Sequence, residues 1–228
     1  MKIPVPWPLA RYPLRKFVLV PILACGFVAQ TAPLAMVVLS TAGRDAGRLP
    51  AGWGIRVNHG KPVVNVCQDA DTACLHLLSV RSSFAIEKSV DVDTAQMPYL
   101  TWNWKVAQLP PGGDFRRSST DDQAAQLLVA FGDRRVISYI WDTGAPKGAM
   151  ESVSAIPFVH IVAVVCESGS GQANQWLTES RNLAADYARA YGRPAPRVKG
   201  LRIQINSQHT GTVAESYFGE VEFRSTVQ

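Results

Sequence analysis

The sequence predicts a mainly β protein: a two-sheet sandwich with one helix near residues 175–191 and an apolar helix at the N-terminus. Three observations predict this class. The chain has 228 residues, 47% hydrophobic and 18% charged, which suits one globular domain with a sizeable core. Most of it divides into short apolar runs separated by turn residues, at the intervals typical of all-β sandwiches. Only one stretch after the N-terminal segment has helical spacing.

The N-terminal segment predicts export. Residues 17–43 carry no charged side chain and follow Arg11, Arg15 and Lys16, the arrangement of a secretory signal or a membrane anchor. In order of preference, we expect a cleaved signal peptide, an uncleaved anchor, or a lipoprotein lipidated at Cys25, because residues 22–25 resemble a lipobox. Each places the remaining chain outside the inner membrane, in the periplasm. We therefore assign residues 1–43 to the signal or anchor, 44–48 to a linker and 49–228 to the sandwich.

The charge distribution argues against nucleic acid as a partner. The formal net charge is +5, but residues 1–42 hold four basic residues and no acidic one, which leaves +1 for the other 186 residues. That is too little positive charge, too scattered, to attract a phosphate backbone. We expect membrane contact only through the N-terminal segment.

About ten strands follow from the apolar runs. They lie within 55–66 (two runs), 74–80, 83–92, 98–106, 124–132, 135–142, 157–166, 199–206 and 216–224. The residues Asn58 to Lys61 predict a hairpin turn inside the first run, with Gly60 supplying the positive φ. Cys67 and Cys74 flank a polar turn between two runs, a placement that predicts a loop-closing disulfide in an oxidising compartment. The stretches 110–114 and 144–154 are expected to be loops.

Residues 174–191 predict the helix. Trp176, Leu177, Leu183, Tyr187 and Tyr191 recur at helical spacing, and Gly192 followed by Pro194 ends the pattern. We expect this helix at the flank of the sandwich, anchored through ion pairs that involve Glu179, Arg181 and Asp186.

The run PYLTWNWKV alternates strictly. Leu100, Trp102 and Trp104 share one face, whereas Asn103 and Lys105 share the other. Core packing is the first interpretation of the two indoles. The alternative is a sugar-stacking platform, which requires one of them to be partly exposed.

The stretch TDDQAAQ leads directly into an apolar run. Asp121 and Asp122 could cap turns, pair with arginine, accept hydroxyl hydrogen bonds or hold a calcium ion through oxygen ligands. Gln126, surrounded by Ala and Leu, is either satisfied internally or directed into a pocket. His209 has no second metal ligand nearby in sequence. We expect no cofactor, with calcium as the alternative, and assign no metal ligand.

The motifs LPAGW (49–53), PYLTWNWKV, LPPGGDFR (109–116), TDDQAAQ (120–126), YIWD (139–142), TESRN followed by DY, and HTGTVAE (209–215) resemble those of the bacterial family called domain of unknown function 3047. The resemblance spans about residues 49–224. It implies an exported protein and a jelly-roll sandwich similar to galactose-binding-like and carbohydrate-binding modules. It implies no catalytic residue. The CQDADTAC turn and Ser180, where a second arginine is expected, depart from that pattern.

These observations predict a noncatalytic exported β-sandwich that binds a carbohydrate or another cell-envelope component. The chain has none of the common motifs for nucleotides, zinc or serine hydrolysis. The candidate ligand-binding residues, expected to lie together, are Trp102, Trp104, Lys105, Asp121, Asp122, Gln126, Trp141, Arg181 and His209. One alternative is an envelope polysaccharide hydrolase or lyase that uses two of Asp121, Asp122 and Glu215. The other is a structural assembly protein with no ligand and no pocket.

Overall fold

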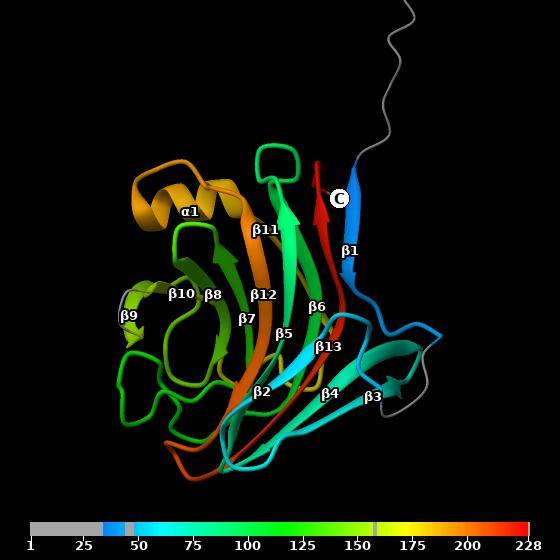
Figure 1. The fold of residues 1–228 in the computed structure, drawn as a ribbon. Coiled ribbons are helices and arrows are strands. Elements are labelled where there is room, and N and C mark those ends of the chain that lie inside the picture. Colours follow the sequence, from blue (N-terminus) through cyan, green and yellow to red (C-terminus); the bar gives the residue numbers. More distant parts are fainter. Residues whose placement is uncertain (1–33, 44–47, 157–158, 228) are drawn as a thin grey trace, which may run out of the picture. The chain divides into compact units, whose positions relative to one another are not determined.

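A computed structural model describes residues 34–43, 48–156 and 159–227, which form two sheets and one helix (Figure 1). Sheet A has the order β11-β6-β13-β4-β3, with β1 also paired to β13. Its strands are β1 (Ala35–Leu39), β3 (Val63–Asp69), β4 (Thr72–Val80), β6 (Tyr99–Gln108), β11 (Leu177–Asn182) and β13 (Val213–Arg224). Sheet B has the order β2-β5-β12-β7-β8-β10-β9. Its strands are β2 (Gly54–His59), β5 (Ser83–Val92), β7 (Ala125–Phe131), β8 (Arg135–Asp142), β9 (Met150–Ile156), β10 (Val159–Ser168) and β12 (Val198–Asn206).

The core lies between the two sheets, and β6 shows how alternation builds it. Leu100, Trp102, Trp104 and Val106 are each 0% exposed, whereas Lys105 and its neighbours on the other face point away from sheet B. Because successive side chains of a strand point to opposite faces, one strand supplies both a core row and an outer row. The predicted alternation of this strand is confirmed.

The sandwich begins earlier than the predicted residue 49. Residues 35–39, which the sequence assigns to the signal or anchor, form β1 and pair with the end of β13. Val38 and Leu39 are buried, and the indole N–H of Trp53 donates to the Val38 carbonyl at 3.1 Å. The apolar side chains of β1 therefore belong to the core of the sandwich.

The earlier part of the predicted export segment, residues 1–33, lies outside the described residues. No described helix is long and apolar enough to cross a membrane.

The predicted hairpin at residues 58–61 is wrong. β2 pairs with β5 in sheet B, and β3 pairs with β4 in sheet A, so the chain changes sheets at this turn. Gly60 does have a positive φ of 69°, and a Cβ there would lie 2.8 Å from the Ser82 Cβ. Gly60 is needed because the chain passes close to Ser82 where it crosses from sheet B to sheet A. The hairpin that the chain does form here joins β3 and β4 through the polar turn after Cys67.

The predicted helix over 174–191 is only half present. Residues Leu177–Asn182 form β11, an edge strand paired with β6, and α1 spans Leu183–Tyr191. Asn182 ends the strand and caps the helix, since its side chain accepts a hydrogen bond from the Ala185 N–H at 2.9 Å. Gly192 in the left-handed region ends the helix, as predicted. Residues 150–156, within and just past a predicted loop, likewise form a strand, β9, along β10.

Candidate functional site

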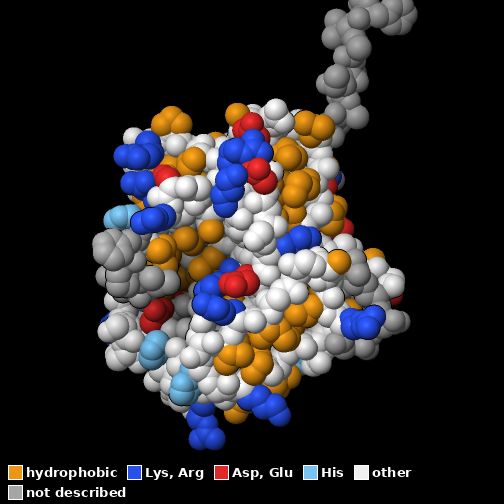
Figure 2. Space-filling model, viewed as in Figure 1, with side chains coloured by type: hydrophobic (Ala, Val, Ile, Leu, Met, Phe, Trp, Pro, Cys, Tyr) orange, Lys and Arg blue, Asp and Glu red, His pale blue; other side chains and the backbone are white. Residues whose placement is uncertain are grey.

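The outer face of sheet B, turned away from sheet A, is hollowed and carries the candidate site (Figure 2). Strand register aligns its side chains in rows across β5, β12, β7 and β8. The first row is Ser89, Gly200, Ala130 and Val136; the second is Glu87, Arg202, Leu128 and Ser138; the third is Ala85, Gln204, Gln126 and Ile140. Small and apolar residues fill the first row, an ion pair enters the second, and two amides occupy the third.

Two cavities lie over these rows. The larger has a volume of about 540 Å³, which falls in the range of about 300–1,000 Å³ typical of small-molecule sites. The smaller has a volume of about 240 Å³. Leu128, Ile161 and Arg202 line both cavities. The two cavities therefore adjoin, and together they form what we call the sheet B groove.

Side-chain amides dominate the polar lining of the smaller cavity. Gln126 donates from Nε2 to Asn206 Oδ1 at 2.7 Å, and Asn206 donates from Nδ2 to the Asp121 carbonyl at 2.6 Å. Gln123 donates from Nε2 to Asp121 Oδ1 at 3.0 Å. Gln204, beside Gln126 in the third row, also lines this cavity. The prediction offered two alternatives for Gln126; in the structure it is hydrogen-bonded internally and also lines a pocket.

Ser138 is a buried polar group without a partner at this cavity. Its side chain lines the smaller cavity, the residue is 4% exposed, and Oγ has no hydrogen-bond partner among the described residues. Buried hydroxyls are normally paired, so an orphan at a cavity wall favours a ligand that supplies the partner. By contrast, the charges beside it are matched: Arg202 donates from Nη2 to Glu87 Oε2 at 2.7 Å.

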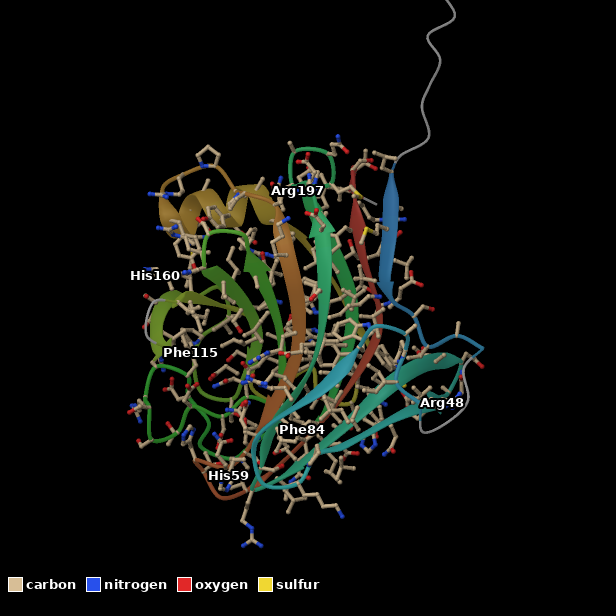
Figure 3. All side chains as sticks on the ribbon, viewed as in Figure 1. Arg48, His59, Phe84, Phe115, His160 and Arg197 are labelled. Carbon is tan, nitrogen blue, oxygen red and sulfur yellow. The ribbon has the colours of Figure 1, made fainter. Side chains whose placement is uncertain are left out.

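The loop before β7 closes one end of the smaller cavity. Its Phe115 lies on the β9 and β10 side of the face (Figure 3) and packs against Ile140 and Ala163. Asp121 lines the cavity from the same loop. Burial raises the pKa of the Asp121 carboxyl, although the hydrogen bond from Gln123 acts in the opposite direction. Asp121 is therefore a carboxyl that faces a cavity and takes up a proton more readily than an exposed one.

Asp122 and His209 do not line the smaller cavity; they connect the loop before β7 to a neighbouring loop. Asp122 is 0% exposed, and its Oδ2 accepts hydrogen bonds from the Thr210 N–H at 2.6 Å and from Thr210 Oγ1 at 2.8 Å. His209 is exposed; its Nδ1 lies 3.0 Å from the Asp121 carbonyl and 3.6 Å from Asp122 Oδ1. Both residues join the loop before β7 to the loop before β13. Asp122 is too deeply buried to contact a ligand.

The three candidate tryptophans are core residues. Trp102, Trp104 and Trp141 are each 0% exposed, with Trp102 and Trp104 in edge contact at a centroid distance of 5.4 Å. Trp104 also packs against Trp141, whose indole N–H donates to the Gly169 carbonyl at 3.0 Å. The sugar-stacking alternative for Trp102 and Trp104 is therefore wrong, because alternation directs both rings between the sheets.

Lys105 lies on the opposite side of the sandwich from the groove, on the outer face of sheet A. Its Nζ donates to Asp69 Oδ2 at 2.5 Å and lies 4.5 Å from the centroid of the Tyr217 ring. Trp176 donates to the same Asp69 oxygen at 2.7 Å. These bonds hold the pKa of Asp69 below its usual range, with the hydrogen bond from Lys105 as the largest cause. Lys105 thus belongs to an internally matched cluster and cannot contribute to the groove.

Arg181 lies at the edge of the sandwich and anchors the helix. From β11 it donates through Nε and Nη2 to both carboxylate oxygens of Asp186 on α1, at 2.9 and 2.7 Å. The Tyr139 hydroxyl donates to Asp186 Oδ2 at 2.8 Å. The predicted ion-pair anchoring of the helix is present, although Arg181 and Glu179 lie on a strand rather than on the helix. Burial, followed by the charge of Glu167, raises the pKa of Glu179.

The paired carboxylates required by the hydrolase alternative do not meet. Glu215 lies on the outer face of sheet A, where its Oε1 contacts His76 Nε2 at 2.7 Å and accepts from the Tyr217 hydroxyl at 3.0 Å. Of the three proposed carboxylates, only Asp121 lines a cavity of the groove. The described residues also contain no group of three or more His, Cys, Asp or Glu side chains placed to hold a metal ion.

Cys67 and Cys74 face each other directly across the β3–β4 hairpin. Their Sγ atoms are 3.3 Å apart and both thiols are free. Burial, followed by the contact with Cys67, raises the pKa of Cys74 to about 12. The predicted disulfide remains a prediction, with its two partners adjacent.

The nine candidate residues therefore do not form one site. The structure brings Asp121 and Gln126 to the groove and leaves the others in the core, behind the loop, on sheet A or at the sandwich edge. Sequence reasoning missed Ser138, Arg202, Gln204 and Asn206. Arg202, Gln204 and Asn206 stand at every second position of β12, an alternation that places them on one face of that strand. Ser138 lies on β8, and no comparable local pattern marks it.

Fold and site define a two-sheet β-sandwich with a groove across the outer face of one sheet. The model for proteins of unknown function DUF3047 matches residues 53–222, so the chain belongs to that family. The predicted membership is confirmed. No curated protein matches the chain.

Several solved structures are similar at the level of fold. The xyloglucanase domain of NopAA from Sinorhizobium fredii, in complex with cellobiose, is 9% identical with a TM-score of 0.47, covering 80% of this chain and 96% of that one. A family 30 carbohydrate-binding module of Clostridium thermocellum is 9% identical with a TM-score of 0.46, covering 86% and 99%. A family 11 carbohydrate-binding module of the same organism, in complex with a mixed-linked tetrasaccharide, is 10% identical with a TM-score of 0.43, covering 85% and 96%. No residue role transfers across such distant likeness.

Proposed function

We propose that this protein is an exported, noncatalytic β-sandwich that binds a hydroxyl-rich ligand, a carbohydrate of the cell envelope, in the sheet B groove. The carrying observation is the polar wall of the smaller cavity, in which Gln126, Gln204 and Asn206 lie beside the unpaired hydroxyl of Ser138. Amides both donate and accept hydrogen bonds, as sugar hydroxyls do, so the two groups complement each other without a net charge.

The chemistry of the groove favours binding over catalysis. Asp121 is the one carboxyl among the described lining residues of the smaller cavity, and Glu87 in the larger cavity is paired with Arg202. Glycoside hydrolysis in most families needs two carboxyl groups about 5–9.5 Å apart across the scissile bond. The groove offers hydrogen bonds and apolar contact instead. The presence of cavities also argues against the alternative of a structural protein with no pocket.

Export is part of the proposal. It rests on the charge-free stretch that follows Arg11, Arg15 and Lys16. Because β1 contributes Leu39 to the core, any cleavage must fall before this strand. Fractionation of a host cell, with the mass of the processed chain, tests this point: a periplasmic or membrane-bound product that retains residues 35–39 is expected, and a cytoplasmic product would refute export.

A glycan array probed with the full chain, as its host processes it, tests the binding function. The decisive variant is Gln204→Ala, because no hydrogen bond between the Gln204 side chain and another described residue would be broken. Loss of one net hydrogen bond of about 0.5–1.5 kcal/mol lowers affinity about two- to tenfold. The matched control is Asn65→Ala, an exposed amide on β3 of the opposite sheet. A flat array, or equal losses from both variants, would refute the proposal.

A further inference from the structure

The larger cavity of the groove is chemically unlike the smaller one. Leu128, Ala130, Val136, Val159 and Ile161 line it with aliphatic groups, and no aromatic ring is among the lining residues that the structure describes. Its charged residues are occupied: Glu87 pairs with Arg202, and Lys88 donates from Nζ to the Val38 carbonyl at 3.1 Å. What this cavity offers a ligand is mainly aliphatic surface.

Small residues give this cavity its floor. Gly200 and Ala130 are neighbours in the first row, and Gly54 on β2 lines the same cavity. A Cβ at Gly200 would lie 3.8 Å from the Ala130 Cβ, an ordinary contact, so packing does not require glycine there. The row therefore leaves space that ordinary strand residues would fill. Exposed apolar hollows of this kind usually mark binding surfaces.

The two cavities meet at Leu128, Ile161 and Arg202, so one ligand can extend from the amide wall into the aliphatic hollow. A sugar ring alone suits only the first part. In the larger cavity its hydroxyls would face aliphatic walls, and each hydroxyl left unpaired costs about 1–3 kcal/mol. A hydrocarbon chain has no such cost there and gains up to about 0.8 kcal/mol per buried methylene.

We propose that the groove binds a saccharide that carries a hydrocarbon chain, with the sugar in the smaller cavity and the chain in the larger. This inference rests on the proposed carbohydrate binding and names the class of ligand. The Glu87 and Arg202 pair marks the border between the two parts. An acylated or alkylated sugar of the cell envelope has the required chemistry.

Calorimetric titration with methyl, butyl, hexyl and octyl β-D-glucopyranoside, each below its micelle-forming concentration, tests the inference. Affinity is expected to rise with chain length by up to about fourfold per methylene, the equivalent of 0.8 kcal/mol. Sodium octanoate, which has the chain without the sugar, is expected to bind at least tenfold more weakly than octyl glucoside. Binding that is independent of chain length, or equal for octanoate, would overturn the inference.

Two variants separate the parts of the site. Ala130→Leu places a larger side chain in the aliphatic cavity, so it should remove the dependence of glucoside affinity on chain length. Gln204→Ala should weaken all four glucosides by the same factor. A chain-length dependence that persists in Ala130→Leu would reveal nonspecific adsorption and overturn the inference. Glycan-array binding without any chain effect would defeat this inference alone, whereas a flat array with no glucoside binding would defeat the proposed function as well.

Discussion

Replacing Asp122 with alanine should lower the stability of the fold and leave the lining of the sheet B groove unchanged. The buried carboxylate accepts two hydrogen bonds from Thr210, through the backbone N–H and through Oγ1. Hydrogen bonds to charged groups contribute about 1.5–3 kcal/mol each. The other oxygen, Oδ1, is buried without a hydrogen bond, and alanine would remove that cost. The two hydrogen bonds together therefore set a range whose lower limit is about 3 kcal/mol, and we expect the free energy of unfolding to fall by about that amount.

For a domain of this size, about 3 kcal/mol corresponds to a fall in Tm of about 6–12 °C. Thermal unfolding followed by tryptophan fluorescence measures it, because Trp102, Trp104 and Trp141 are fully buried and report on the core. Asp71→Ala is the matched control, an exposed aspartate in the β3–β4 turn, and should leave Tm within about 1 °C. If Asp122→Ala kept the wild-type Tm and lost ligand binding instead, the assignment of Asp122 to loop anchoring would be wrong.

Three further predictions concern β1, the hairpin cysteines and Asp121. Leu39→Ala should destabilise the fold by about 2–5 kcal/mol in urea unfolding, because the side chain is 0% exposed in the core. An unchanged unfolding midpoint would show that β1 is not part of the sandwich. Oxidation of the purified protein should join Cys67 to Cys74, with a mass loss of two hydrogen atoms and a Tm increase that a reductant reverses; two thiols that stay free under oxidant would contradict it. Asp121→Asn should stabilise the protein increasingly as pH rises. The folded-state pKa of Asp121 lies above its usual value of 3.8, so its contribution to stability is present below that value and is lost as pH rises through the folded-state pKa. A difference in Tm between variant and wild type that stays constant from pH 3 to 7 would contradict this reasoning.

Local patterns were enough to predict most strands and the inward-facing residues. In β6 the alternation of Trp102, Asn103, Trp104 and Lys105 specifies two faces, and the structure has both. The strand β11 shows where local patterns fail. Thr178 to Arg181 alternate in exposure like a strand, but the Ala-rich stretch after Asn182 extends a helical spacing back across them. These residues form a strand because they pair with β6, which lies about 75 residues away in sequence.

The site was harder to predict than the fold because its residues are neighbours only through register. Gln126 and Gln204 are adjacent because β7 pairs with β12, and Ser138 lies opposite Leu128 because β7 pairs with β8. Nothing local in the sequence encodes these pairings. The candidates were instead chosen for chemical prominence, and prominent side chains such as tryptophan and arginine have structural roles in the core and at the sheet edge here.

The two outer faces of the sandwich differ in a way that favours one of them as the proposed binding surface. On sheet A, Lys105 is matched by Asp69, and Glu215 by His76 and Tyr217. On sheet B, the Ser138 hydroxyl has no partner among the described residues. In the first row of that sheet, Gly200 and Ala130 form the floor of the larger cavity. A face whose polar groups satisfy each other gains little from a ligand, whereas an unpaired hydroxyl beside an unfilled aliphatic hollow gains both a hydrogen bond and buried apolar area. The energetic asymmetry between the faces, rather than the number of polar residues on either, is the reason that we propose sheet B as the binding face.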